Sequence, residues 1–225
     1  MIVETIEGIF VEEIKNRFLC SVEIENKIYE CYVPSSTRLS NFFELQGVPV
    51  LLVKNEGKKT RTEYKLHAVF VNDEWVLVNL NLINTLFEEY FRITNSEINL
   101  QREKMIDNKY KADLYAVSND EESIYEIKGV LSQDVEPLFP AVIGERAIKQ
   151  LNFFSRTLLK KRININYVII FLSSSIEAVR LNRKEQQYLR LFRRCVKRGM
   201  QVSFYKVICS KDEIHLEKAS AAIYK

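Results

Sequence analysis

Apolar and polar positions alternate in a strand-like pattern up to about residue 80. Residues 17–33 are expected to form a hairpin that turns at Asn26–Lys27. Cys20 and Cys31 would then be diagonal neighbours on one face, which is a poor placement for a disulfide. Three more strands are predicted at residues 48–55, 62–71 and 74–80. Five short strands in so short a segment predict a small closed or half-closed β-barrel.

A helical period replaces this alternation after residue 80. Ile83, Leu86 and Tyr90 recur at the spacing of one helix face. Further helices are expected at residues 144–162 and 182–199, and strands at 111–117, 123–130, 165–174 and 200–208. This order of helices and strands predicts an α/β sheet. We therefore expect a mixed α/β chain with a β-barrel domain at residues 1–80 and an α/β domain at residues 81–225.

One predicted strand carries charge where burial is expected. Alternate side chains of a strand share a face, so Glu126 and Lys128 lie together between apolar neighbours. A hairpin with the preceding strand would bring Asp113 close to Glu126. Removing such charges from water costs several kcal/mol unless partners compensate. The alternative is an exposed hairpin whose Glu–Lys pair contributes at most about 1 kcal/mol, and it stays open on this pattern alone.

Two carboxylates and a lysine in this arrangement suit a magnesium-dependent phosphodiester hydrolase. Mg²⁺ prefers oxygen ligands, lowers the pKa of a bound water and offsets the charge that grows on a phosphate. We expect Asp113, Glu126 and the Ile127 carbonyl to bind the metal. Lys128 would orient the attacking water or neutralise developing oxyanions. Glu89, in the first predicted helix, is a candidate third carboxylate, with a solvated helix glutamate as the alternative.

The helix predicted at residues 144–162 adds two candidate catalytic residues. Glu145 and Lys149 are four residues apart and therefore share a helix face. The polar side of this helix, flanked by Arg146 and Gln150, is expected to look into the same cleft. A simple surface ion pair between Glu145 and Lys149 is the alternative.

Cations cluster locally although the chain as a whole is close to neutral. The 33 Lys and Arg residues against 30 Asp and Glu residues give a net charge of +3, which does not by itself indicate an anionic partner. Clustered cations bind phosphates and release counterions, which makes affinity sensitive to salt. For the most basic helix, a solvated face is the alternative. The candidate nucleic-acid-binding residues are Lys58, Lys59, Arg61, Arg146, Arg190, Arg193, Arg194 and Lys197.

Several other classes of protein are disfavoured. The four cysteines show no CxxC spacing and the two histidines are far apart, which argues against a zinc site. The N-terminal segment lacks the basic region of a signal peptide. No stretch approaches the roughly 20 apolar residues of a membrane span. We therefore expect a cytoplasmic protein with reduced thiols and no membrane partner.

Taken together, these residues resemble the sugar fermentation stimulation protein A (SfsA) family nearly end to end. The resemblance rests on "RFLCSVEI", "VPSSTRL", "VNLNLINTLFEE", "ADL", "YEIKGV", "FPAVIGERAIKQL" and "GMQVSFYK". It implies an N-terminal OB-fold and a restriction-endonuclease-like domain of the PD-(D/E)XK type. The pattern of that family falls on Asp113, Glu126 and Lys128, with Glu89 as its helix glutamate and Glu145, Arg146 and Lys149 on its E-R…K helix.

The chain also departs from the pattern of this family. In "FPAVIGER", Ala141 stands where the family has an aspartate and Gly144 where it has a threonine. The loops "PSST" and "NEGKKTR" differ from the family's "PNTG" and its "NPKRK"-type loop. The first departure puts a secondary function of the site in doubt, and the altered loops put the ligand surface of the OB-fold in doubt.

Three functions stay open at this point. The first is a nucleic-acid-binding protein, most plausibly for DNA, that hydrolyses phosphodiester bonds with Mg²⁺ or Mn²⁺. The second is a DNA-binding regulator of sugar-metabolism genes that keeps the nuclease fold as a scaffold. The third is an interaction module whose charges are structural. The oligomeric state is also open, a homodimer included.

Overall fold

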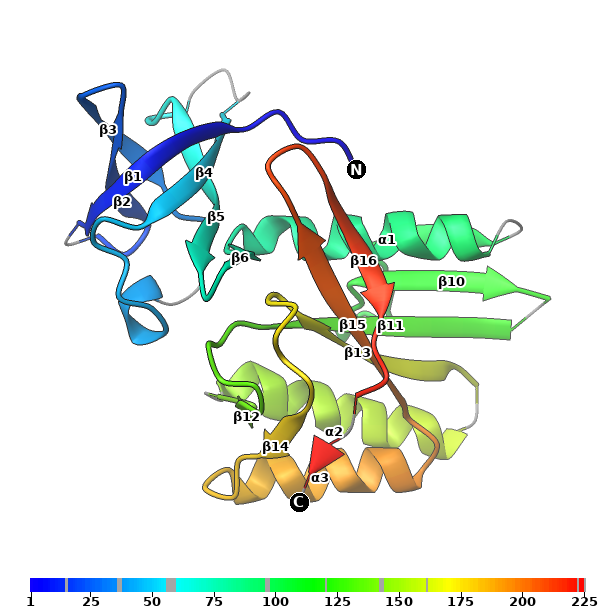
Figure 1. Ribbon diagram of the computed structural model, residues 1–225. Helices are drawn as coiled ribbons and strands as arrows, with labels where there is room; N and C mark the ends of the chain where they lie inside the picture. The colour runs from blue at the N-terminus through cyan, green and yellow to red at the C-terminus, as the bar shows by residue number, and fades with distance from the viewer. Residues whose placement is uncertain are drawn as a thin grey trace.

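The computed structural model describes residues 1–14, 16–35, 38–55, 60–95, 98–119, 121–141, 144–160, 162–221 and 223–224. A β-barrel forms the N-terminal part of the chain, and a mixed sheet covered by helices on both faces forms the rest (Figure 1). The mixed α/β fold with an OB-like barrel, predicted from the sequence, is confirmed.

Five strands close the barrel. The elements of this part are β1 (Ile6–Glu13), β2 (Leu19–Ile24), β3 (Lys27–Tyr32), β4 (Pro49–Lys54), β5 (Tyr64–Val71) and β6 (Glu74–Leu77), with a short 3-10 helix at Leu39–Asn41. The strand order is β3-β2-β1-β4-β5-β6, and a parallel pairing of β3 with β5 closes the ring. Closure leaves β6 outside the ring as a hairpin partner of β5, next to the second sheet.

The sequence missed one barrel strand and misplaced one turn. Strand β1 was not predicted, although it pairs with both β2 and β4. The turn between β2 and β3 lies at Glu25–Asn26, whose φ angles of 48° and 63° are those of a tight two-residue hairpin. This one-residue shift places Cys20 directly opposite Cys31 and not diagonal to it. Both thiols are buried and free.

The second sheet has the strand order β16-β15-β13-β11-β10-β7. Its strands are β7 (Asn99–Arg102), β10 (Leu114–Ser118), β11 (Glu121–Val130), β13 (Asn164–Phe171), β15 (Gln201–Cys209) and β16 (Ile214–Lys218). The helices are α1 (Ile83–Thr94), α2 (Glu145–Lys160) and α3 (Gln186–Lys197), with a 3-10 turn at Leu80–Leu82 before α1. Shorter strands are β8 (Met105–Ile106), β9 (Tyr110–Lys111), β12 (Leu138–Phe139), β14 (Val179–Leu181) and β17 (Ile223–Tyr224).

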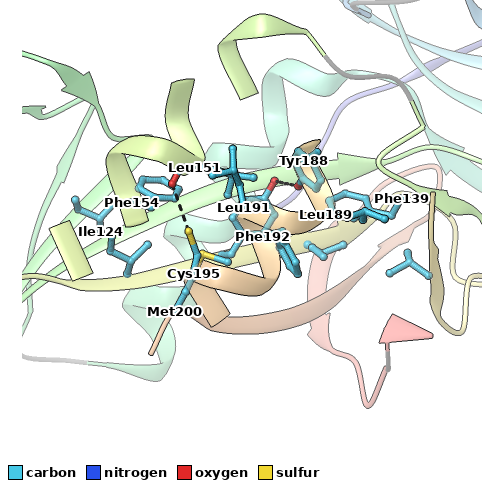
Figure 2. Packing of buried hydrophobic residues seen from close by; sticks show 14 of the residues in the cluster. Ile124, Phe139, Leu151, Phe154, Tyr188, Leu189, Leu191, Phe192, Cys195 and Met200 are labelled. Carbon is cyan, nitrogen blue, oxygen red and sulfur yellow. Dashed lines mark hydrogen bonds between the residues drawn. The ribbon is translucent and has the colours of Figure 1, made fainter. Parts of the chain in front are cut away.

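The two faces of this sheet bury different helices. Helix α1 lies on one face, and α2 and α3 lie on the other (Figure 1). Ile127 of β11 packs in the cluster that contains α1, whereas its neighbours Ile124 and Val130 pack with α2 and α3. Because strand side chains alternate, Glu126 and Lys128 share the face of α2. Figure 2 shows that layer, where the Cys195 thiol of α3 donates to the Leu151 carbonyl of α2 at 3.3 Å.

Backbone and side-chain hydrogen bonds join the barrel to the sheet. The Leu77 N–H of β6 donates to the carbonyl of Leu172, the residue that follows β13, at 3.2 Å. The Glu74 carboxylate of β6 accepts hydrogen bonds from the three serines that follow β13, including the Ser174 N–H at 2.8 Å. Burial opposes ionisation of Glu74, but these hydrogen bonds outweigh it and lower its pKa. Among the described residues, no helix has the length and apolar character needed to cross a bilayer.

We predict that His67 makes the folded state sensitive to acid. Both ring nitrogens are buried without a hydrogen-bond partner among the described residues, and burial lowers the pKa of His67 from 6.5 to about 4. Between those values the unfolded chain binds a proton that the folded chain does not, so stability falls as pH drops from 6.5 to 4. The loss from this one group is expected to reach roughly 3 kcal/mol.

The measurement is urea unfolding of wild type, His67→Leu and His215→Gln across this pH range. His67→Leu should lack this part of the acid sensitivity, and His215→Gln, at a more exposed histidine, should keep it. The same pH dependence in wild type and His67→Leu would contradict the prediction.

Candidate functional site

The hairpin of β10 and β11 brings two carboxylates together. These strands are antiparallel with Leu114 opposite Tyr125, and continuing that register places Asp113 beside Glu126. The Asp113 Oδ2 accepts the N–H of Ile127 at 2.9 Å, which fixes its carboxylate beside this strand. The local strand pairing therefore creates the acidic pair.

Glu126 is buried and held at both oxygens. Its side chain is 2% exposed, which is rare for a carboxylate without compensating partners. The hydroxyl of Tyr110, on β9, donates to Oε2, and the ammonium of Lys128 donates to Oε1. The Gln150 side-chain amide of α2 donates in turn to the Tyr110 hydroxyl at 3.4 Å. Three elements thus position one carboxylate.

The surroundings of Asp113 raise the pKa of its carboxyl group. Burial is the largest cause that raises its pKa, and the nearby Glu126 carboxylate is the next. The Ile127 N–H and the Lys128 ammonium act in the opposite direction, and the balance raises the pKa of Asp113 from 3.8 to about 6. Burial and the neighbouring carboxylate together therefore outweigh the Ile127 N–H and the Lys128 ammonium.

An open cleft of about 690 Å³ exposes this cluster to solvent. Asp113, Glu126, Ile127 and Lys128 line one side of it. Helix α2 contributes its first turns opposite them, and the start of α1 contributes polar amides. The lining residues from these two regions are Arg146, Ala147 and Gln150 on α2, Leu80 and Asn81 in the 3-10 turn, and Ile83 and Asn84 in the first turn of α1.

Three of the predicted catalytic or metal-binding side chains lie away from this cleft. Glu145 and Lys149 form an exposed ion pair at 3.6 Å, with side chains 91% and 80% exposed, and neither lines the cleft. The Glu89 carboxylate lies 4.0 Å from the N-terminal amine and does not line the cleft either. The face of α2 that meets the acidic pair is the one that carries Arg146 and Gln150.

The predicted nucleic-acid-binding cations lie in different places. Arg146 lines the cleft, whereas Arg61 is engaged with Glu30 at 3.1 Å on the barrel. Four predicted cations lie exposed on α3, outside the cleft: Arg190, Arg193, Arg194 and Lys197. Lys58 and Lys59 lie outside the described residues.

Sequence reasoning missed Tyr110, Asn81 in the 3-10 turn, and Asn84 in α1. Tyr110 lies in a short hairpin of β8 and β9, and it reaches Glu126 only because that hairpin folds back beside α2. Its position three residues before Asp113 has the wrong parity for a strand face shared with that aspartate. The pattern therefore contained no local signal for its role.

The donor set fits a hard divalent cation. Within the described ranges, no group of three or more His, Cys, Asp or Glu side chains is placed to bind a metal. The acidic pair offers two carboxylates, and cations such as Mg²⁺ and Ca²⁺ complete such a set with backbone oxygens and water. Burial, and next the Glu126 carboxylate, raises the pKa of Asp113, and a bound cation would stabilise its ionised form.

Comparisons with known proteins agree on both parts of the chain. A family model described as the SfsA N-terminal OB domain matches residues 14–78, and one described as the sugar fermentation stimulation protein RE domain matches residues 79–213. The structure of SfsA from Pyrococcus furiosus in complex with Ca²⁺ superposes with a TM-score of 0.83. The match covers 99% of this chain and 97% of the Pyrococcus chain at 16% sequence identity. Similarity at this level of identity shows a shared fold alone.

Curated relatives carry the name sugar fermentation stimulation protein homolog. The relative from Methanobrevibacter smithii is 29% identical over 74% of this chain and 73% of its own length. That from Caldanaerobacter subterraneus is 26% identical over 94% of both chains. The relative from Natranaerobius thermophilus is 41% identical over 37% of this chain, and this chain spans 34% of that protein's length.

We predict that Asp113→Asn stabilises the metal-free protein at high pH. In wild type the folded-state pKa of about 6 exceeds the usual 3.8, so the ionised carboxylate destabilises the fold above pH 6 and not below about 4. The amide removes that repulsion, can still accept the Ile127 N–H, and can donate to Glu126. We expect a gain of roughly 2 kcal/mol at pH 8 that fades as pH falls to 4.

The gain is measured by denaturant unfolding in a chelator, with Asp134→Asn as the control at an exposed aspartate. Equal effects of Asp113→Asn at pH 8 and pH 4 would argue against charge repulsion as its cause.

Proposed function

The chain belongs to the sugar fermentation stimulation protein (SfsA) family, and we propose that it binds DNA in the cytoplasm and hydrolyses its phosphodiester bonds with Mg²⁺ or Mn²⁺. One observation carries the proposal. A buried glutamate, Glu126, lies against Asp113 in an open cleft and is paired with Lys128 two residues further along the strand. Carboxylates held close together in a cleft are typical of functional sites, and a divalent cation there would offset their repulsion.

The residues that would hold the metal are Asp113, Glu126 and the backbone of Ile127, as predicted from the sequence. A divalent cation held there would lower the pKa of a coordinated water and offset the negative charge that grows on the phosphate. The structure of SfsA from Pyrococcus furiosus is a complex with Ca²⁺, which supports a divalent-cation site in this chain. Ca²⁺ and Mg²⁺ share a preference for oxygen ligands, although Mg²⁺ demands tighter geometry.

The surrounding side chains have separable tasks. Tyr110, held by Gln150, fixes the orientation of Glu126 by donating to one of its oxygens. Lys128 contacts the other oxygen, and its side chain is 34% exposed, so its ammonium can also reach a water or a phosphate oxygen in the cleft. Arg146 lines the opposite side, where its guanidinium can bind a phosphate oxygen and place the phosphodiester near the acidic pair.

Hydrolysis and binding are tested with the same variants. Mg²⁺ or Mn²⁺ should support cleavage of labelled DNA by wild type, and Glu126→Gln and Lys128→Met should each reduce the rate by at least about 100-fold, since both remove groups that act on the transition state. Glu217→Gln, an exposed acid on β16, is the control and should keep the rate. No cleavage by folded wild type with either metal, on single-stranded and duplex DNA alike, would contradict hydrolysis.

Metal binding has its own readout. Mn²⁺ at 100 times its dissociation constant should stabilise wild type by about 2.7 kcal/mol, seen as a rise in melting temperature. Glu126→Gln should lose most of that rise while remaining folded.

The non-catalytic regulator is the second candidate. Two observations favour it: Lys128 is already paired with Glu126, and Glu89 adds no third carboxylate to the cleft. It predicts DNA binding by wild type and by Glu126→Gln with equal affinity and no cleavage by either.

A further inference from the structure

A second groove runs along the outer edge of α2, beside the cleft. It has a volume of about 450 Å³ and lies between α2 and the turn that connects β8 to β9. Its lining residues are Asp107 and Lys109 from that turn, and Lys149, Asn152, Phe153, Arg156, Thr157 and Lys160 from α2. Cations dominate it: four of these side chains are basic and Asp107 is the one acid among them.

Most of this positive charge is not neutralised by the protein itself. In the described part of the chain, no carboxylate lies within 4.0 Å of Lys109, Arg156 or Lys160 in an ion pair, and all three are exposed. Lys149 has Glu145 at 3.6 Å, but both side chains are largely in water, where such a pair is weak. The groove is therefore complementary to a polyanion.

The cations follow the helix axis. Lys149, Arg156 and Lys160 are separated by seven and four residues, the spacing of a single stripe. At 1.5 Å per residue the stripe is about 16 Å long. A nucleic-acid strand in a duplex carries one charge per 3.4 Å of axis, so a stripe of this length faces several consecutive phosphates.

This groove and the acidic cleft share a wall. The Phe153 ring stacks on the Tyr110 ring with centroids 4.9 Å apart and planes at 25°. The hydroxyl of that same tyrosine donates to Glu126. Gln150, one helical turn before Phe153, lines the cleft, so α2 passes from cleft to groove within one turn.

We propose that this groove, which we call the α2 groove, binds the phosphate backbone of the nucleic acid whose scissile bond lies in the cleft. The proposal rests on the proposed function and adds the surface that positions the strand. It reassigns Lys149 from catalysis to backbone binding and gives Lys109, Arg156 and Lys160 a role. Cations of α3, by contrast, line neither the groove nor the cleft, so they do not guide a strand toward the acidic pair.

Two triple variants with equal loss of charge separate the two surfaces. The α2 groove variant is Lys109→Gln/Arg156→Gln/Lys160→Gln, and the α3 variant is Arg190→Gln/Arg193→Gln/Lys197→Gln. Binding of the full chain to a fluorescent DNA oligonucleotide, single-stranded and duplex, is measured by anisotropy in EDTA at several salt concentrations. Hydrolysis is thereby excluded, and circular dichroism melting verifies that each variant is folded.

The α2 groove variant should bind at least about 10-fold more weakly at low salt, and the slope of log affinity against log salt should shrink by roughly 2 to 3, one phosphate contact per cation removed. The α3 variant should lose less than about 3-fold. A charge-preserving variant, Lys109→Arg/Arg156→Lys/Lys160→Arg, should keep most of the wild-type affinity and slope.

Each other outcome overturns the inference. Wild-type affinity in the α2 groove variant, or an equal loss in both triple variants, would show that the groove does not hold the backbone while leaving DNA binding intact. Failure of wild type to bind any DNA would instead remove the proposed function itself, and the inference with it.

Discussion

The buried carboxylate of Glu126 is the constraint around which the C-terminal part of this protein is arranged. A carboxylate that is 2% exposed is tolerated only when other groups replace the water it has lost. Here Tyr110 and Lys128 occupy its two oxygens, and they come from different elements. The small hairpin of β8 and β9, which has little core of its own, is thus fixed to the sheet by a polar contact as well as by packing of the Tyr110 ring on Phe153 and Phe154.

This arrangement keeps two carboxylates close together in the cleft that is proposed to bind a metal ion. Asp113 lies beside Glu126, and burial together with the charge of Glu126 raises the pKa of Asp113 to about 6. The rest of the fold resists this local cost: β11 lies in the middle of the sheet, between β10 and β13, and its apolar side chains pack against helices on both faces. A central strand with a full set of neighbours cannot relax its register to separate the two carboxylates.

The sequence was informative wherever the relevant geometry is local. Asp113 and Glu126 could be paired because they flank one short hairpin, and the two-residue period of a strand placed Lys128 on the same face. The orientation of helix faces was harder to predict, since an error of one residue rotates a side chain by about 100° around the helix axis. Arg146 and Gln150 were expected to face the cleft and do line it, whereas Glu145 and Lys149, expected to face it with them, do not. Glu89 was misplaced for a different reason: its partner is the N-terminal amine, 88 positions away, and no local pattern reports where a chain end will lie.

The barrel is connected to the cleft by the segment that follows β6, which we call the junction. The segment that leaves β6 is bonded to the His67 carbonyl and then turns directly into Asn81 and Asn84, which line the cleft. The Glu74 carboxylate accepts hydrogen bonds from the serines that follow β13. Because β13 pairs with β11, these bonds hold the junction at the end of the strand next to the one that carries Glu126. The position of the barrel therefore fixes one wall of the cleft. A ligand bound by the barrel would lie at a fixed distance from Asp113 and Glu126. The barrel and the acidic pair are thus fixed relative to one another through this one junction.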